Sequence, residues 1–188
     1  NESLVASQKS VQLEPQDAEA HNNLGVILQE LGRLEESEAR YRQTITLKPD
    51  FAEVHFNLGN TLQELGRLKE AEASYRQAII LKPDYAEAHD NLGIILHELG
   101  RLKEAEANYR QAITLKSDYT GAHNNLGVTL QELGRLDEAC SAYIQAIDLN
   151  ADFTDAYGNL GIAIKNVRFN SSNVKLYPVL IRLLSTGN

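Results

Sequence analysis

The chain has 188 residues, and its 26 acidic and 18 basic side chains give a formal net charge of −8 at pH 7. Its apolar fraction of 43% argues against an intrinsically disordered segment, and no run of about 18 apolar residues could span a membrane. Nucleic-acid affinity rests largely on Lys and Arg that neutralise phosphates. We therefore expect neither a nucleic-acid nor a membrane partner. The cellular compartment stays unassigned from the sequence, with the cytoplasm favoured.

An eight-residue pattern returns every 34 residues along the chain. It reads AEAHNNLG from residue 18, AEVHFNLG from 52, AEAHDNLG from 86 and TGAHNNLG from 120, and a modified copy, TDAYGNLG, starts at 154. Self-similarity at a fixed period indicates an array of small units rather than one globular domain. We divide the chain into a truncated repeat that keeps only its second helix (1–17), full repeats (18–51, 52–85, 86–119 and 120–153), a first helix with its turn (154–170) and a divergent apolar helix (171–188).

Each full repeat contains two amphipathic patterns separated by a glycine. In the first repeat, Leu24 and Leu28 share one helical face, and Leu34, Tyr41 and Ile45 recur at helical spacing after the glycine. The pattern predicts helix, turn and helix, and therefore an all-α fold. The spacing of Asp50 to Glu53, and of Asp84 to Glu87, is typical of a capping box at the start of a helix.

Nine of the 12 glycines fall on two slots of the repeat. Four follow a leucine where the first helix ends, a place where a residue with positive φ is common: Gly32, Gly66, Gly100 and Gly134. Five lie inside the first helix: Gly25, Gly59, Gly93, Gly127 and Gly161. Because glycine inside a helix costs roughly 1 kcal/mol relative to alanine, this second slot predicts a close approach between helices.

The repeats resemble the tetratricopeptide repeat, whose period is 34 residues. The family motif Trp-x-x-Leu-Gly-x-x-Tyr becomes His-x-x-Leu-Gly-x-x-Leu from residue 21, and the small and aromatic slots of the family hold Ala71, Tyr75 and Ala78. The resemblance covers about residues 1 to 167. It implies a right-handed superhelical solenoid of stacked helix-turn-helix repeats, in which the first helix of each pair lines the concave face.

Under that arrangement, one stripe of each first helix faces inward and carries repeat positions 2, 5, 6, 9, 12 and 13. Position 6 is asparagine in five consecutive repeats. The predicted peptide-binding residues of the stripe are Asn22, Asn23, Glu30, Phe56, Asn57, Asn60, Glu64, Asp90, Asn91, His97, Glu98, Asn124, Asn125, Glu132 and Asn159.

Two interpretations of the position-6 asparagines stay open and are compatible. The asparagines could brace neighbouring helices, or they could form a ladder of amides that holds the main chain of an extended peptide, since each amide offers donors and an acceptor. A ladder of this kind resembles the repeat region of the O-linked N-acetylglucosaminyltransferases. The family's two-carboxylate clamp needs Lys or Arg at positions 2, 5 and 6, where this chain has none, so we do not expect it to bind the acidic C-terminus of a chaperone.

Charge is segregated between the two kinds of helix. Lys165 is the only Lys or Arg on a first helix, and the other 17 lie in second helices, turns and tails. We therefore expect an acidic groove that favours a neutral or basic peptide.

Other residues suggest chemistry that the pattern does not support. Four histidines share position 4, but equivalent residues of stacked helices lie about 10 Å apart, whereas zinc holds each ligand nitrogen at roughly 2.0–2.1 Å. We interpret them as packing residues in the family's Trp slot. Cys140, the only cysteine, follows Ala139 on a second helix and reads as a small packed residue. We predict no catalytic residue, metal site or cofactor.

The sequence thus predicts a non-catalytic protein-protein interaction scaffold whose concave groove binds an extended peptide segment. Two alternatives stay open: the targeting or substrate-recognition region of a larger enzyme such as a glycosyltransferase, or a self-association module. The apolar tail around Leu180, Ile181 and Leu184 suggests that two chains could pair through the C-terminal end as a homodimer.

Overall fold

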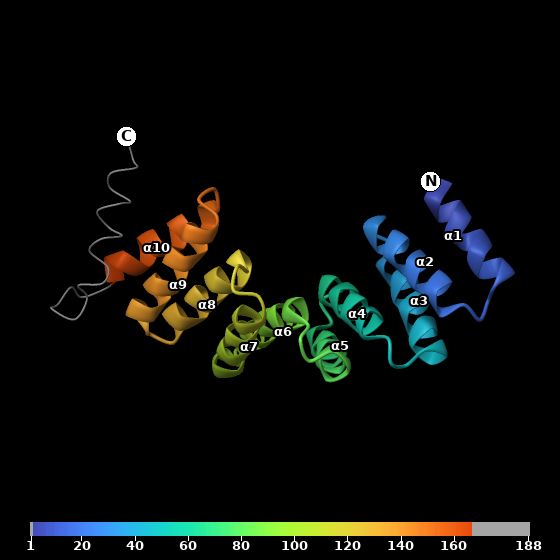
Figure 1. Cartoon of the computed structure of the whole chain (residues 1–188), viewed down its shortest axis with the longest axis horizontal. Helices are drawn as coiled ribbons and strands as arrows, with labels where there is room; N and C mark the ends of the chain where they lie inside the picture. Colours follow the sequence, from blue (N-terminus) through green and yellow to red (C-terminus); the bar gives the residue numbers. More distant parts are fainter. Residues whose placement is uncertain (1, 167–188) are drawn as a thin grey trace. The chain divides into compact units, whose positions relative to one another are not determined.

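The computed structural model describes residues 2–166, and this part of the chain contains ten α-helices and no strand (Figure 1). The chain forms two compact units, residues 1–95 and 96–188, with the boundary inside one helix. The helices are α1 (Glu2–Leu13), α2 (Ala18–Glu30), α3 (Leu34–Leu47), α4 (Ala52–Glu64), α5 (Leu68–Leu81), α6 (Ala86–Glu98), α7 (Leu102–Leu115), α8 (Thr120–Glu132), α9 (Leu136–Leu149) and α10 (Thr154–Asn166).

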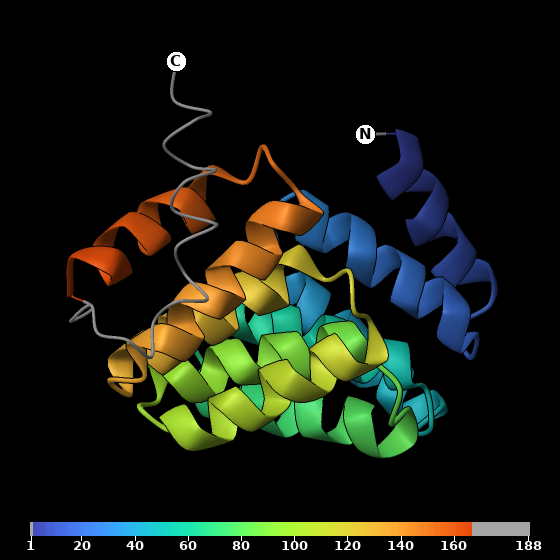
Figure 2. The same ribbon diagram turned by 60° about the vertical axis from the view of Figure 1, so that its left-hand side comes forward.

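Within each unit, the first and second helices of a repeat pack side by side as hairpins, as in α2 with α3 and α8 with α9 (Figures 1 and 2). The turn glycines have φ between +71° and +76°, as predicted. At the first turn, the amide of Gly32 donates to the carbonyl of Gln29, and that of Arg33 donates to the carbonyl of Leu28. This pair of bonds satisfies two carbonyls at the helix end and sets the direction of the second helix.

The glycines inside the first helices make room for a tyrosine of the second helix. A Cβ atom at Gly25 would lie 2.7 Å from the ring of Tyr41, and one at Gly59 would lie 2.6 Å from the ring of Tyr75. Both tyrosine side chains are fully buried. The close approach predicted for this slot is therefore confirmed in these repeats, while a Cβ at Gly161 would meet nothing within 4 Å among the described residues.

Ion pairs join successive second helices within each unit. Glu38 of α3 contacts Arg42 of its own helix at 2.8 Å and Arg67, just before α5, at 2.6 Å. Arg42 and Arg67 also contact Glu70, at 3.1 and 2.6 Å. The four side chains therefore form a closed ring of ion pairs. The same ring recurs in the second unit with Glu106, Arg110, Arg135 and Glu138.

The predicted capping box at Asp50 is wrong. Helix α4 begins at Ala52, its N-cap residue is Phe51, and no side chain caps it. The capping position is Phe51, one residue after Asp50, and Lys48 lies over its ring at 4.7 Å. The Lys–aromatic contact recurs before α6 and α8. Asp17, at the equivalent position before α2, does cap its helix by accepting from the amide of Glu19.

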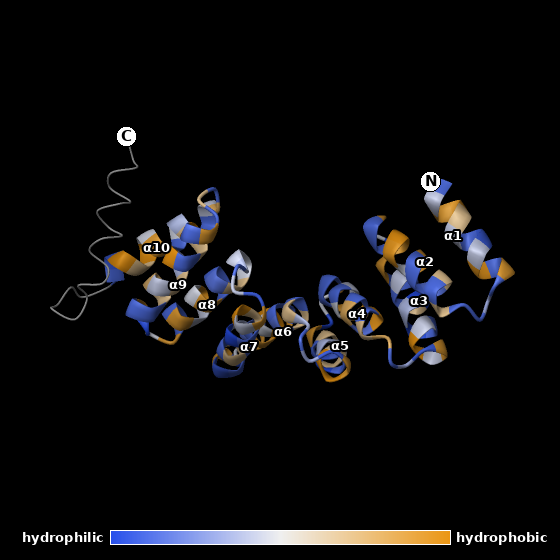
Figure 3. Ribbon diagram, in the orientation of Figure 1, coloured by the Kyte–Doolittle hydropathy of each residue, from blue (hydrophilic) through white to orange (hydrophobic). Residues whose placement is uncertain are grey.

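Apolar residues form stripes along the helices, as Figure 3 shows for α4 and α5. Val54, Leu62 and Tyr75 of these helices are fully buried. No helix of the described part is both long and apolar enough to cross a membrane. The predicted apolar helix at 171–188, and with it the proposed dimer surface, lies outside the described residues.

Candidate functional site

The predicted site residues lie on the first helices: α2, α4 and the start of α6 in the first unit, and the end of α6, α8 and α10 in the second. In each unit we call the surface at repeat positions 5, 6, 9, 12 and 13 the asparagine face. Its position-6 members differ in accessibility: Asn23 is exposed, and Asn57, Asn91, Asn125 and Asn159 are half-buried.

A polar network crosses the asparagine face in the first unit. Nδ2 of Asn91 donates to Oδ1 of Asn60 at 2.8 Å, which joins α6 to α4. The hydroxyl of Tyr75 on α5 reaches the same Oδ1 at 2.8 Å and Oε1 of Gln63 at 2.9 Å. A buried tyrosine of the second helix therefore contacts the amides of the first helices from behind.

Aromatic rings border this network. The ring of Phe56 lies 4.8 Å from that of Tyr85 and 5.9 Å from that of Tyr75, between ring centroids. Phe56 is half-buried and lies one helical turn before Asn60 on α4. It thus packs against α5 and the residue that precedes α6, and it is not fully covered.

In the second unit the amides pair differently. Nδ2 of Asn159 on α10 donates to Oδ1 of Asn124 on α8 at 3.0 Å. His97 Nε2 lies 3.1 Å from Oε1 of Glu132 without the alignment of a hydrogen bond, so the approach becomes an ion pair only when the imidazole is protonated. A contact between His97 and a ligand stays a prediction.

Several predicted residues are less accessible than a groove lining requires. Asn22, Asp90 and Asn124 at position 5 are only 7%, 4% and 8% exposed. Asn91 and Asn159 act as braces between first helices, whereas no hydrogen bond is found for the side chains of Asn23 and Asn57 in residues 2–166. The bonds of Asn91 and Asn159 fit the bracing interpretation, and the amide ladder stays a prediction.

The acidic members of the face are exposed: Glu30, Glu64, Glu98 and Glu132. In the first unit, Gln29 donates to Glu64 across the repeat boundary at 2.7 Å. Burial raises the pKa of Tyr41 to about 12, and the carboxylates of Glu53, Glu30 and Glu64 act in the same direction. Carboxylates from two repeats therefore act on one hydroxyl.

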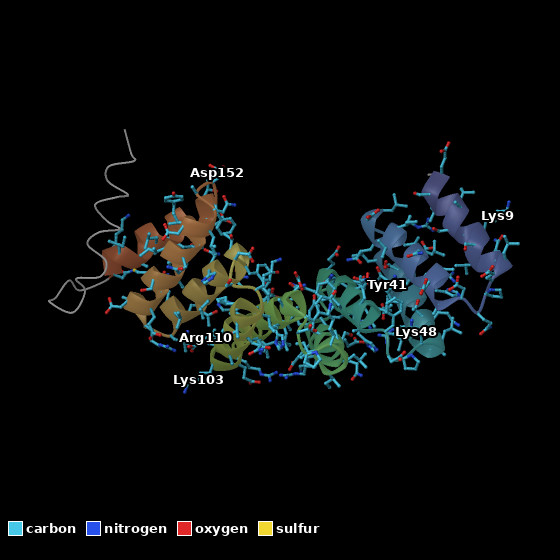
Figure 4. The ribbon with its side chains drawn as sticks, viewed as in Figure 1. Lys9, Tyr41, Lys48, Lys103, Arg110 and Asp152 are labelled. Atoms are coloured by element: carbon cyan, nitrogen blue, oxygen red, sulfur yellow. The ribbon has the colours of Figure 1, made fainter. Side chains whose placement is uncertain are left out.

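The basic residues come from the other helices. Figure 4 labels Lys48, Lys103 and Arg110, which belong to second helices or their ends, and Tyr41, which lies on α3. Arg110 and Arg135 are held by Glu106 and Glu138 in the ring described above. Basic charge therefore lies mainly on the second helices and the turns before them, and Lys165 of α10 is the one Lys or Arg on a first helix of the described part.

The position-4 histidines have a role that the sequence reasoning missed. Nε2 of His21 lies 3.1 Å from the carbonyl oxygen of Pro15, and His55 approaches the carbonyl of Pro49 at 3.0 Å. His89 and His123 make the same contact, each to the residue six places earlier. The signal available in the sequence was a proline six places before each of the first three histidines, Pro15, Pro49 and Pro83; Ser117 stands at this place before His123.

Other candidate chemistry lies apart from the asparagine face. Cys140 is fully buried, and burial raises the pKa of its thiol to about 11. No group of three or more metal-capable side chains occurs in residues 2–166. A cavity of about 460 Å³ in the second unit is bounded by α7, α8 and α9, with Ile113 and Leu126 among its walls, and it contains no predicted site residue.

Comparisons with known proteins identify the repeat. A sequence profile described as tetratricopeptide repeat matches residues 16–81 and 50–118, and a second profile of the same description matches residues 120–153. No curated protein matched the chain.

Solved structures share the fold at low sequence identity. The structure of YrrB, described as a TPR protein with an unusual peptide-binding site, is 23% identical, with a TM-score of 0.77 over 91% of this chain and 88% of that one. A structure of MamA is 22% identical, with a TM-score of 0.75 over 79% and 86%. A thermophilic TPR protein of Thermus thermophilus is 23% identical, with a TM-score of 0.67 over 86% and 88%. At these identities the likeness establishes the fold, an all-α solenoid of helix-turn-helix repeats.

Proposed function

The chain belongs to the tetratricopeptide repeat family, and we propose that it is a non-catalytic scaffold that binds an extended peptide segment of a partner protein along the asparagine face. The observation that carries this proposal is the row of amides on the first helices, of which Asn23 and Asn57 have no side-chain partner among the described residues. Accessible amides without protein partners can hold the main chain of any extended peptide.

Charge defines the partner more narrowly. The exposed acids of the face attract a segment that is neutral to basic, and the arginines of the second helices are engaged in ion pairs on another surface. The burial of Cys140, with its raised pKa, supports a role without nucleophilic catalysis. YrrB has a peptide-binding site on the same fold, which agrees with this assignment.

A peptide selected from a random 12-residue library against the whole chain tests the proposal. Asn23→Ala combined with Asn57→Ala should weaken its binding by about 1–3 kcal/mol, since one hydrogen bond contributes roughly 0.5–1.5 kcal/mol. Titration calorimetry measures the loss. The control is Gln43→Ala with Gln111→Ala, which removes two exposed amides from second helices. Equal affinity in both double variants, with helicity intact by circular dichroism, would move recognition away from the asparagine face.

The acids should act mainly on association. Exposed charges are screened beyond about 8 Å at physiological salt. Glu30→Gln combined with Glu64→Gln should therefore slow association and flatten its salt dependence, with little change in the dissociation rate. Stopped-flow fluorescence at several salt concentrations separates the two rates. An unchanged association rate would remove the preference for basic segments.

A further inference from the structure

We infer that Asn60 and Asn91, held by the hydroxyl of Tyr75, form an amide pair that recognises the main-chain N–H and C=O of a single residue of the bound segment. The inference rests on the proposed function and deepens it, because it identifies which residues of the face fix the register of the peptide. The inward stripe includes Asn60 among its predicted contacts, but its slot predicts no paired role, since the other repeats have Val26, Ile94, Val128 and Ile162 there.

A count of donors and acceptors shows that one nitrogen and one oxygen of this amide pair are available to a ligand. An asparagine side chain has one oxygen with two lone pairs and one nitrogen with two hydrogens. Oδ1 of Asn60 accepts from Asn91 at 2.8 Å. The single hydroxyl proton of Tyr75 goes either to the same Oδ1 at 2.8 Å, which then has both lone pairs in use, or to Oε1 of Gln63 at 2.9 Å. Nδ2 of Asn60 and Oδ1 of Asn91 have no hydrogen-bond partner in the described part of the chain. The pair therefore offers one donor group and one acceptor to a ligand.

The tyrosine fixes the pair from behind. The side chain of Tyr75 is fully buried, and its ring packs against the backbone of Gly59, so its hydroxyl cannot move away from the amides. Nδ2 of Asn91 also lies 3.5 Å from this hydroxyl. Turning both amides over would exchange donor and acceptor and would still leave one of each facing outward, so the pair stays complementary to a main chain in either arrangement.

The other repeats show that the pair is specific to this place. In the second unit the corresponding bond joins Asn159 to Asn124, but Asn124 is only 8% exposed, so its spare donors lie between the helices. The equivalent residues of the first unit, Asn22 and Asn57, are not joined, and Oδ1 of Asn22 is buried without a partner. Asn60 and Asn91 are both half-buried, which keeps an oriented amide pair within reach of a ligand.

This geometry defines a class of ligand. In an extended strand, the N–H and C=O of one residue point to the same side, as they do in a hydrogen-bonded antiparallel pair. The carbonyl accepts from Asn60 and the amide donates to Asn91. Proline is excluded at that residue because it has no N–H. Phe56, which is half-buried one turn away on α4, favours an apolar side chain at a neighbouring residue.

The test uses a fluorescein-labelled 12-residue peptide selected from a random library against the whole chain, with binding followed by anisotropy. Asn60→Val introduces the residue that two other repeats have at this position. It should weaken binding about 2- to 13-fold, which corresponds to the loss of one hydrogen bond. Tyr75→Phe should weaken it by a smaller factor because the amides remain but are no longer held. The matched control is Tyr143→Phe, which removes an equally buried hydroxyl whose partner is Gln131. Tyr143→Phe should leave the affinity unchanged.

A backbone scan of the same peptide identifies the atoms involved. N-methylation at one residue should weaken binding to the wild-type chain, and this loss should shrink in Asn91→Ala. A peptide that binds equally well to wild type, Asn60→Val and Tyr75→Phe, yet is weakened by Asn23→Ala with Asn57→Ala, overturns this inference and leaves the proposed function standing. Equal losses in Tyr75→Phe and Tyr143→Phe also overturn it. A library that yields no binder overturns the proposed function and the inference together.

Discussion

Replacing a glycine inside a first helix by alanine should destabilise the fold, although alanine is the better helix former. In Gly59→Ala, the new Cβ would lie 2.6, 2.7 and 3.0 Å from three ring carbons of Tyr75. Real contacts of this kind stay above about 3.0 Å, so either the ring or the helix must shift. The ring is fully buried against its neighbours and has no open space to move into.

Two terms of opposite sign decide the outcome. Alanine gains roughly 1 kcal/mol over glycine in a helix interior. Overpacking a well-packed core typically costs about 1–3 kcal/mol, and three close contacts against a rigid ring place the cost toward the upper end of that range. We therefore expect a net loss of about 1–2 kcal/mol in the free energy of unfolding.

Urea denaturation followed by circular dichroism at 222 nm measures this loss. The matched control is Gly158→Ala in α10, where a Cβ would meet nothing within 4 Å among the described residues. It should be neutral or more stable by up to about 1 kcal/mol. If Gly59→Ala proved as stable as Gly158→Ala, the tyrosine contact would not be the reason for the glycine slot.

Further predictions concern the stack and its ion pairs. Deleting residues 86–119, one whole repeat, should leave a helical and less stable protein, because each repeat contacts mainly its neighbours; loss of a cooperative urea transition would contradict this. Burial acts to raise the pKa of Glu38, but hydrogen bonds from Arg42 and Arg67 outweigh it and hold the pKa below its usual value. Stability from this group is present above the unfolded pKa of about 4.5 and is lost as the pH falls through the lower folded value. Glu38→Gln should therefore reduce the acid sensitivity of the urea midpoint. Asp17→Ala should cost about 0.5–2 kcal/mol through the lost cap of α2, measured in the same way.

The architecture could be predicted from the sequence because each of its causes is local and recurs. A glycine at a fixed distance after a leucine marks the turn, and its φ of +71° at Gly32 follows from the left-handed conformation that this place requires. The mid-helix glycines were predictable as close approaches, since only packing offsets their cost in helix propensity. The start of α4 was not predictable from the capping-box spacing, because the N-cap residue is Phe51, one place after Asp50, and its side chain has no acceptor to cap the helix.

The asparagine row shows why slot identity alone does not define a site. Five asparagines share one position, yet Asn91 and Asn159 donate to a neighbouring helix, while Asn23 and Asn57 have no such partner in residues 2–166. The same two residue types, at the same spacing, are joined as Asn124 with Asn159 and not joined as Asn22 with Asn57. What an asparagine offers a ligand is therefore set by the donors and acceptors that its neighbours leave unused. Which donors and acceptors stay unused depends on the geometry of side chains from two repeats. A residue pattern within one helix does not contain that geometry.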